Sequence, residues 1–498
     1  MTVIKKLLKE FSIPILALLL TCLYPSVFMF CHNVEEAPFA SIFPFWGIFS
    51  AHAGMTFLIL LLLLRKAGAA AFLSSLSMLV VINYTLIFDG LSEVIPELTM
   101  EHILVPALFI FTVLIFLFLW KKPEMQMGCT LISITFGALI LVSFLNAGIT
   151  SFMAAEASPD VDPLESYEPQ VFEGEKPNVY FLLFDEYGGT ENLAHYYDYH
   201  NALEDELAGK GFDISTNSYN TESLLTVTII PNLMNMDYVA TDSTRTATKN
   251  AMLSMPNFFR TFKDNGYKIN LVNHLDYFGE EGCNVFTSQQ SSRSISDYLL
   301  TNSLYSHIPE LKDLINDLIQ ADYVAQYPSI LFNAMDGGRE AIKNVGPEPT
   351  LTMIYLQTPH APTILDKNGK LVKNHEIMGW HWDIPELYLG QLEFVNTYIL
   401  EIVNEILETD PNPLILVQSD HGCRQARHFY QMGIWETYDA PKENLMQQNF
   451  LNCAYYPGMD LQIEGKNGIN TLRTVMNQVF GTNYKEIEPV YYTKGDFE

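Results

Sequence analysis

The sequence predicts a two-part protein: five membrane-spanning helices, followed by an α/β domain with a mostly parallel central sheet flanked by helices. Three observations predict this fold class. The first 150 residues are almost uncharged and contain five long apolar runs. The later residues have an ordinary globular composition with a large acidic excess. Within them, short runs rich in β-formers alternate with helical patterns, which is typical of a parallel sheet covered by helices.

The five apolar runs are each long enough to cross about 30 Å of hydrocarbon. They cover residues 11–31, 42–64, 69–88, 103–120 and 127–149. A cleaved signal peptide is the alternative for the first run, but the four runs behind it favour a membrane anchor.

The charges between the runs predict the topology. The basic residues all fall on one side of the predicted membrane: Lys5, Lys6, Lys9, Arg65, Lys66, Lys121 and Lys122. The other two loops contain acidic residues and neither Lys nor Arg. The positive-inside rule therefore predicts a cytoplasmic N-terminus and an extracytoplasmic location for everything after the fifth helix.

These patterns divide the chain into a membrane domain (1–150), a linker (151–177) and a catalytic domain (178–498). The linker is acidic and rich in proline, without apolar periodicity. In the catalytic domain we expect strands at 178–184, 268–273, 351–357 and 414–418. Helices are expected at 192–210, 256–265, 308–321 and 385–408.

Charge and cysteine content exclude some classes of protein. The formal net charge of −29 comes almost entirely from the catalytic domain, which argues against nucleic acid as a partner. The six cysteines are scattered and form no CxxC pair. Neither a zinc ribbon nor a disulfide framework is therefore predicted.

Two predicted strands end in potential metal ligands. The first runs into Asp185 and Glu186, and the last runs into Asp420 and His421. Functional groups of such sheets collect beyond the carboxyl ends of the strands. Oxygen and imidazole ligands together suit Zn²⁺ or Mn²⁺, with Mg²⁺ less favoured. Glu186 could serve a second metal or face solvent.

The order of these motifs resembles the alkaline phosphatase superfamily. A strand ends in an acidic residue, a threonine or serine follows about 40 residues later, a histidine comes next, and a strand then ends in Ser-Asp-His-Gly. With five membrane helices in front, the chain resembles membrane-bound sulfatase-like hydrolases and transferases, including lipoteichoic acid synthases and lipid A phosphoethanolamine transferases. The resemblance implies a metal held by Asp185, Asp420, His421 and the nucleophile.

The resemblance also points to the nucleophile. The related transferases have a T-x-x-S-x-P pattern at a helix start, and Thr226 with Pro231 fits its spacing. Ile229 replaces the serine of that pattern, and Thr221 and Ser223 are rival nucleophiles. A threonine hydroxyl is a poor nucleophile unless a metal or base helps to form the alkoxide.

Substrate contacts are expected from further polar residues. His360 follows a predicted strand in an H-x-P setting, and the resemblance implies that it contacts the transferred group or protonates the leaving group. Arg424, His381 and His428 are further substrate-binding candidates. For these three, a surface or packing role is at least as good an interpretation.

The resemblance implies a transferase of the cell envelope. We expect a bacterial inner-membrane protein that moves a phosphoglycerol or phosphoethanolamine headgroup from a membrane phospholipid to a glycan or lipid through a covalent threonine intermediate. A sulfuric or phosphoric ester hydrolase of the same fold is one alternative. A catalytically inactive scaffold is the other. True sulfatases use a C/S-x-P/A-x-R motif, which this sequence lacks.

Overall fold

A computed structural model divides the chain into two compact units. Unit 1 contains residues 1–157 and 292–323, and unit 2 contains residues 158–291 and 324–498. The structure describes residues 2–32, 39–92, 100–156, 167–244, 246–274, 277–289, 299–300, 302–308, 310–312, 314–315, 323–372, 384–424 and 440–490.

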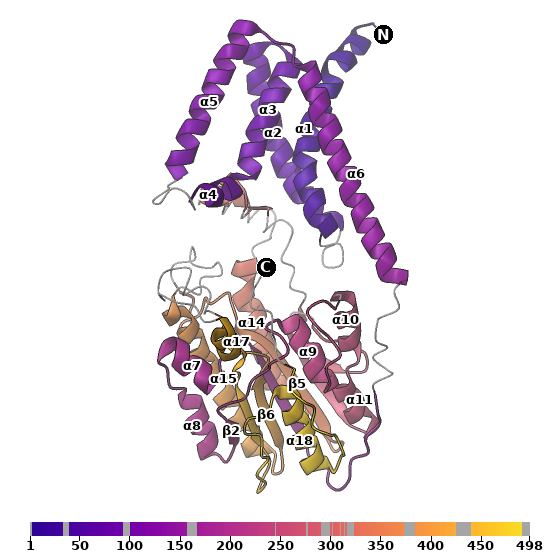
Figure 1. Cartoon of the computed structure of the whole chain (residues 1–498), viewed down its shortest axis with the longest axis vertical. Helices are drawn as coiled ribbons and strands as arrows, with labels where there is room; N and C mark the ends of the chain where they lie inside the picture. The colour runs from indigo at the N-terminus through magenta and orange to yellow at the C-terminus, as the bar shows by residue number, and fades with distance from the viewer. Residues whose placement is uncertain are drawn as a thin grey trace. The chain divides into compact units, whose positions relative to one another are not determined.

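Unit 1 is a group of apolar helices, α1 to α6 (Figure 1). Their bounds are α1 Thr2–His32, α2 Phe43–Leu64, α3 Ala67–Ile82, α4 Tyr84–Ser92, α5 Met100–Lys121 and α6 Gln126–Glu156, with the short 3-10 helix η1 at Phe39–Ile42 before α2. Within the part of unit 1 that the structure describes, four segments are long and apolar enough to cross a membrane: Glu10–His32, Phe43–Leu64, Ile103–Lys121 and Gln126–Gly148.

The predicted third span is shorter than expected. Helix α3 has 16 residues, which is about 24 Å of helix and less than the hydrocarbon thickness. It ends at Asn83, whose side-chain amide donates to the carbonyl of Leu79, and the chain continues as α4. The predicted run 69–88 therefore corresponds to a shorter helix and a second helical segment.

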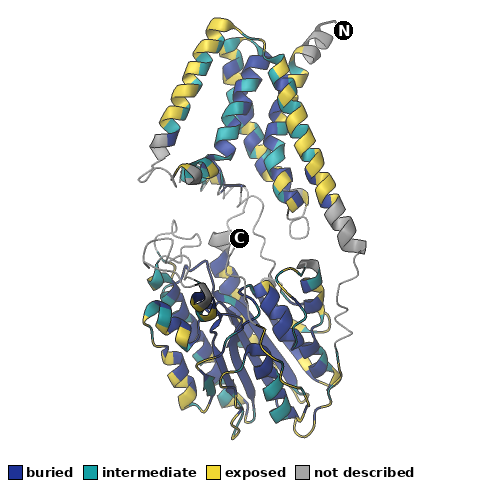
Figure 2. Cartoon of the chain, in the orientation of Figure 1, coloured by how far each residue is buried: buried dark blue, intermediate teal, exposed yellow. Residues whose placement is uncertain are grey.

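Helices α5 and α6 have exposed residues along their length (Figure 2), and many of these are large and apolar. Examples are Phe109, Phe116 and Trp120, which are 65–69% exposed. Apolar surface of this extent fits contact with lipid rather than water. At one end of the helices, the Lys66 ammonium donates to the carbonyl of Lys122 at 2.7 Å. The basic loops that set the predicted topology therefore lie together.

A segment far along the chain packs into unit 1. The 3-10 helix η2 (Leu304–His307) places the Tyr305 hydroxyl 2.7 Å from Nδ1 of His52 on α2. His307 Nε2 lies 3.1 Å from the Thr85 hydroxyl on α4. Leu299, Leu300, Tyr305 and Ile315 are buried in the same apolar core as α1, α2 and α3. The sequence predicted only a helix at 308–321 in this region, and part of that range lies outside the described residues.

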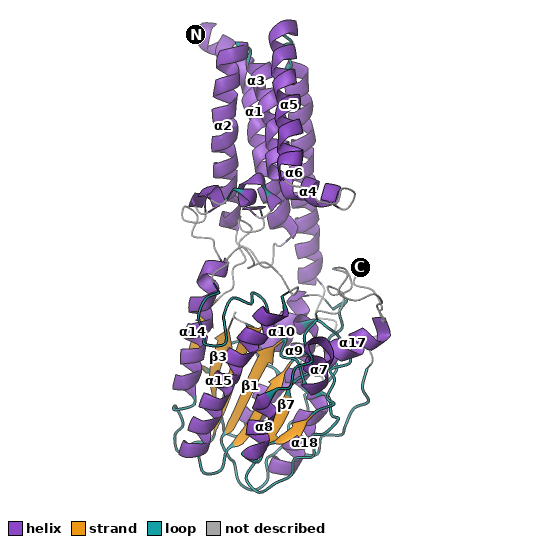
Figure 3. Ribbon diagram, turned by 90° about the vertical axis from the view of Figure 1, so that its left-hand side faces the viewer, coloured by secondary structure: helices purple, strands orange, loops and turns teal. Residues whose placement is uncertain are grey.

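Unit 2 is built on one sheet with helices packed around it (Figure 3). Within the described residues the sheet has seven strands in the order β2-β7-β6-β1-β5-β3-β4. The strands are β1 Val179–Asp185, β2 Asp213–Ser215, β3 Lys268–His274, β4 Asn284–Gln289, β5 Thr350–Pro359, β6 Leu414–Ser419 and β7 Asn452–Tyr455. Strand β1 is central and runs parallel to β5 and β6, whereas β7 pairs in antiparallel fashion with its two neighbours, β6 and β2. The predicted mostly parallel sheet is confirmed.

Helices cover both faces of this sheet. On one face, α9 (Thr226–Asn235), α11 (Asn257–Asp264) and α18 (Gly468–Phe480) share an apolar core with alternate residues of β1. On the other face, α15 (Pro385–Thr409) packs on β5, and Tyr398 of α15 donates to the carbonyl of Met335 in α14 (Tyr323–Ala341). Helices α10 (Thr246–Ser254) and α17 (Ala440–Gln448) complete the unit.

The predicted helix 192–210 is two helices, α7 (Thr190–Tyr197) and α8 (Ala202–Gly209). Asp198 has a positive φ of 49°, which ends α7. Asn201 then begins α8, because its side chain accepts a hydrogen bond from the backbone of Leu203. The apolar periodicity continues through the break, so periodicity alone did not reveal it.

Two adjacent residues test the packing of the 299–315 segment. Ile315 is 3% exposed, whereas Leu314 is 54% exposed. We expect Ile315→Ala to lower the free energy of unfolding by about 2–4 kcal/mol, because it opens a cavity in the core of unit 1. Leu314→Ala is the matched control and should change it by about 0.5 kcal/mol or less. Denaturation of the full chain in detergent measures both, and equal effects would contradict the observed packing.

Candidate functional site

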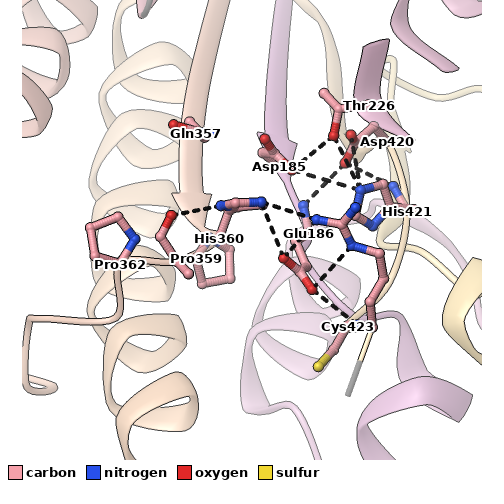
Figure 4. Close-up of polar contacts among 12 residues, drawn as sticks. Asp185, Glu186, Thr226, Gln357, Pro359, His360, Pro362, Asp420, His421 and Cys423 are labelled. Carbon is pink, nitrogen blue, oxygen red and sulfur yellow. Dashed lines mark hydrogen bonds and ion pairs between the residues drawn. The ribbon is translucent and has the colours of Figure 1, made fainter. Parts of the chain in front are cut away.

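The predicted ligands meet at the carboxyl ends of two neighbouring strands (Figure 4). Strand β1 ends at Asp185, and β6 ends immediately before Asp420 and His421. Phe184 and Ser419 are paired in the parallel register, so both strands end at the same level. All three side chains are buried, with exposed fractions of 0–1%.

One ligand atom from each of these three residues lies within 4.8 Å of the others. Nε2 of His421 is 3.8 Å from Oδ1 of Asp185 and 3.4 Å from Oδ2 of Asp420. Nδ1 of His421 lies 2.8 Å from the carbonyl of Gly422. Because a carbonyl can only accept, Nδ1 is the protonated nitrogen, and Nε2 presents its lone pair to the two carboxylates.

One oxygen of the Asp420 carboxylate accepts hydrogen bonds, and the other has no hydrogen-bond partner among the described residues. Oδ1 accepts from the backbone of His421 at 2.8 Å and of Glu186 at 3.1 Å. Oδ2 is buried and has no hydrogen-bond partner among the described residues. An unpaired buried carboxylate oxygen is unfavourable unless a cation neutralises it. The donor set therefore fits a divalent metal, and two carboxylates with one imidazole suit Zn²⁺ or Mn²⁺.

Thr226 lies beside these three residues. It is the first residue of α9, and its hydroxyl is 3.3 Å from Oδ1 of Asp185 and 3.2 Å from Nε2 of His421. The N-terminus of a helix favours an anion because its first backbone N–H groups have no partner within the helix. The Thr226 hydroxyl and the anion-binding N-terminus of α9 therefore lie next to each other in the site.

The rival nucleophiles occupy different surroundings. The Ser223 hydroxyl donates to Oδ1 of Asp242 at 2.6 Å and accepts from the backbone of Leu225 at 2.9 Å. It therefore shapes the loop that leads into α9. The described contacts of Thr221, which is 4% exposed, include none with the three candidate ligands. Ile229, at the position of the serine in the related pattern, is fully buried on α9.

The candidate ligand carboxylates lie close together, and this affects the pKa of Asp185. Burial and the neighbouring Asp420 raise the pKa of Asp185 well above its usual range. The Tyr355 hydroxyl donates to Oδ2 of Asp185 at 3.3 Å. Burial lowers the pKa of His421, which keeps its imidazole neutral. A bound cation would favour the ionised carboxylates and the neutral imidazole together.

Glu186 is fully buried, so the expectation that it might face solvent is wrong. Its carboxylate accepts from the backbone and the guanidinium of Arg424, with the Nη2 contact at 3.3 Å. Burial alone would raise the pKa of Glu186, but the guanidinium of Arg424 lowers it to about 2. The carboxylate is therefore ionised at neutral pH.

His360 lies just after β5 and faces this ion pair (Figure 4). Its Nδ1 is 2.6 Å from the carbonyl of Ala361 and therefore carries the proton. Nε2 accepts from Arg424 Nη2 at 3.0 Å and lies 3.5 Å from Glu186 Oε2. Burial lowers the pKa of His360 to about 4, so the ring is neutral at neutral pH. In this arrangement it contacts Arg424 and has no proton on Nε2 to give a leaving group.

The other predicted substrate-binding residues are placed differently. Arg424 lies in the site, with 16% of its side chain exposed. His381 and His428 lie outside the described residues. Sequence reasoning missed Asn220, which donates to the carbonyl of Asp420 and accepts from the backbone of Gly468. Sequence reasoning also missed Tyr355. A tyrosine within a buried apolar strand could have indicated it, because a buried hydroxyl needs a hydrogen-bond partner.

Comparison with known proteins gave structural matches. The chain is similar to the integral membrane lipooligosaccharide phosphoethanolamine transferase A (EptA) from Neisseria meningitidis, at 12% identity, over 94% of this chain and 95% of that chain, with a TM-score of 0.42. It is similar to the C-terminal periplasmic domain of EcEptC from Escherichia coli, at 13% identity, over 64% of this chain and 87% of that chain, with a TM-score of 0.41. That domain also has a structure in complex with Zn.

A further match is a protein in the alkaline phosphatase superfamily from Vibrio parahaemolyticus, at 13% identity, over 63% of this chain and 68% of that chain, with a TM-score of 0.36. No family model and no curated protein matches the sequence. The matched structures include phosphoethanolamine transferases, one of the groups that the sequence resembles.

The unpaired oxygen of Asp420 leads to a metal-binding prediction. We expect Asp420→Asn to weaken binding of Zn²⁺ or Mn²⁺ by at least about tenfold, because it removes a charged ligand. Glu204→Gln is the matched control, since Glu204 is also buried but bonds to Thr190 away from the cluster. Elemental analysis after dialysis measures bound metal. Equal metal content in both variants would exclude Asp420 as a ligand.

Proposed function

We propose that the chain is a membrane-anchored, metal-dependent transferase that moves a phosphoryl-linked headgroup through a covalent intermediate on Thr226. One observation carries the proposal: the Thr226 hydroxyl, at the start of a helix, lies within 3.3 Å of both Asp185 and His421. A nucleophile, an anion-binding helix terminus and candidate metal ligands therefore converge on one point.

Asp185, Asp420 and His421 would hold the metal, together with the Thr226 oxygen. A divalent ion there supplies positive charge that favours the threonine alkoxide and offsets the charge of the phosphoryl oxygens. Hydrogen bonds within the protein orient these side chains for this chemistry. His421 keeps its Nε2 lone pair directed inward because Nδ1 is fixed on the carbonyl of Gly422. Asp420 is oriented by two backbone N–H groups.

In the proposed reaction, the Thr226 oxygen forms a bond to phosphorus and the bond from phosphorus to the leaving oxygen breaks. The Thr226 hydroxyl donates to Oδ1 of Asp185, so this oxygen is placed to receive the proton. The leaving alcohol takes up a proton from solvent. An acceptor hydroxyl then attacks the same phosphorus and loses its proton to solvent, the bond from phosphorus to the Thr226 oxygen breaks, and Thr226 regains its proton from Asp185.

The apolar helices support a donor that is already in the membrane. Among the described residues four segments are able to span it, and α3 with α4 would supply the fifth crossing, because Lys66 before α3 and Lys122 after α5 lie at the same end. The basic residues there favour a cytoplasmic position for that end. The site would then be extracytoplasmic, where ATP is not available as a phosphoryl donor. A phospholipid with a phosphoglycerol or phosphoethanolamine headgroup fits as donor, and an envelope glycan or lipid fits as acceptor.

The nucleophile can be tested by trapping the intermediate. We expect full-length protein incubated with phosphatidylethanolamine or phosphatidylglycerol to gain the mass of one headgroup on Thr226. Thr226→Ala should abolish the adduct and lower turnover by at least about 10³-fold, because no other serine or threonine hydroxyl contacts the candidate ligands in the described part of the chain. Intact-mass and peptide mass spectrometry measure the adduct.

Ser223→Ala is the matched control for this experiment. Its hydroxyl only shapes the loop, so the adduct should still form. An adduct that survives in Thr226→Ala and disappears in Ser223→Ala would overturn the assignment. Product analysis with and without a glycan acceptor separates transfer from ester hydrolysis, in which water is the final acceptor.

A further inference from the structure

The buried pair of Glu186 and Arg424 lies next to the candidate metal ligands but is not directed at them. Glu186 follows Asp185 in the chain, yet its two carboxylate oxygens face Arg424. We propose that Arg424, fixed by Glu186, is the second cationic group of the site and binds the phosphoryl oxygens, so that the site takes a single divalent ion. This inference rests on the proposed function and names which groups recognise the transferred phosphoryl group.

The backbone at Glu186 is set to aim its side chain. Glu186 has a φ of 59°, in the left-handed region that a residue with a Cβ rarely adopts. Its N–H donates to Oδ1 of Asp420, which holds the backbone in this turn. Such strain persists only where the surroundings fix it. Here they direct the carboxylate of Glu186 away from Asp185 and toward Arg424.

The hydrogen bonds that Arg424 makes with other described residues leave one of its donors for a ligand. A guanidinium has five N–H donors. Nε and one N–H of Nη2 donate to Glu186, and the other N–H of Nη2 donates to Nε2 of His360. One N–H of Nη1 donates to the carbonyl of Leu224 at 3.0 Å. The second N–H of Nη1 has no acceptor among the described residues, and it is the one that a phosphoryl oxygen would occupy.

The contact with Leu224 places this donor beside the nucleophile. Leu224 is two residues before Thr226, in the loop that begins α9. Through this hydrogen bond, Arg424 links the segment that follows His421 to the loop that precedes Thr226. A guanidinium held by several bonds keeps its orientation, which suits recognition of a phosphoryl group better than a flexible ammonium would.

The charge of the site also favours a single metal ion. Asp185, Asp420 and Glu186 contribute three negative charges when ionised, and Arg424 contributes one positive charge, which leaves −2. Both histidines have Nδ1–H and are neutral. One divalent ion balances this charge. A second ion would need Glu186 as a ligand, and the guanidinium of Arg424 already occupies that carboxylate.

Metal content tests the first half of the inference. Full-length wild-type protein should hold one Zn²⁺ or Mn²⁺ per chain after dialysis, and the charge-balanced variant Glu186→Gln/Arg424→Gln should hold the same amount. Two ions in the wild type and one in this variant would show that Glu186 is a ligand, which would overturn the inference.

Phosphate binding tests the second half. Removing one partner of a buried ion pair leaves an uncompensated charge that can prevent folding. The charge-balanced variant Glu186→Gln/Arg424→Gln avoids this problem. We expect it to keep its metal and to bind inorganic phosphate at least about tenfold more weakly than the wild type, because a charge-assisted hydrogen bond is lost. Calorimetry with the metal-loaded full chain measures the affinity.

The chain offers a matched control for this pair. Arg339 and Glu401 form a similar two-bond ion pair on the surface, at 2.7 and 2.8 Å. Glu401→Gln/Arg339→Gln should leave phosphate affinity unchanged. If the Glu186/Arg424 double variant does not fold, Arg424→Lys should keep the metal and still weaken phosphate binding, because a lysine lacks the planar fork.

The outcomes separate this inference from the proposed function. Wild-type phosphate affinity in a folded variant without Arg424 would overturn the role of Arg424, even if the Thr226 adduct still forms. Absence of a Thr226 adduct, with phosphate binding still dependent on Arg424, would instead contradict the transfer reaction and leave an anion-binding site with one metal.

Discussion

The arrangement of unit 2 depends on negative charge buried at the carboxyl end of its central strands. Asp185, Glu186 and Asp420 are all inaccessible to solvent, and each follows or ends a strand whose remaining residues are buried. Carboxylates in such a place are unfavourable unless each is paired or binds a cation. Arg424 compensates Glu186 directly. Asp185 and Asp420 are left facing a neutral imidazole, which is why a divalent metal fits there.

The surrounding fold supports this charged centre with neutral hydrogen bonds. Tyr355 and Asn220 hold Asp185 and the backbone of Asp420 from β5 and from the loop before α9. Gln391 of α15 lies within 3.2–3.3 Å of the carbonyls of Pro359, His360 and Pro362, which fixes the loop that positions His360. These partners come from three separated segments. Preorganisation of this kind keeps the candidate ligands in place without requiring the metal to shape them.

Unit 1 raises a different physical question, because its apolar helices include one that is too short to span the hydrocarbon. A segment from between two parts of unit 2 packs with these helices through Tyr305 and His307. Polar side chains within a membrane helix group need hydrogen-bond partners, and His52 and Thr85 find them in this segment. The same chain region thus belongs structurally to the membrane part, although it lies far from the apolar runs in sequence.

The sequence by itself determined the features that depend on local pattern. Apolar length predicted the helices of unit 1, continuous runs of β-formers predicted β1, β3, β5 and β6, and strand ends predicted the cluster of Asp185, Asp420 and His421. This worked because parallel strands buried on both faces have a strong apolar signal, and their carboxyl ends must meet at one edge.

The tertiary structure decided what depends on side-chain direction and distant partners. The orientation of Glu186 toward Arg424, the direction of both histidine rings and the packing of Tyr305 on His52 could not be predicted from spacing. Short antiparallel strands such as β2 and β7 were also missed. Each is set by contacts between residues far apart in the chain, and local sequence pattern does not encode which distant groups will meet.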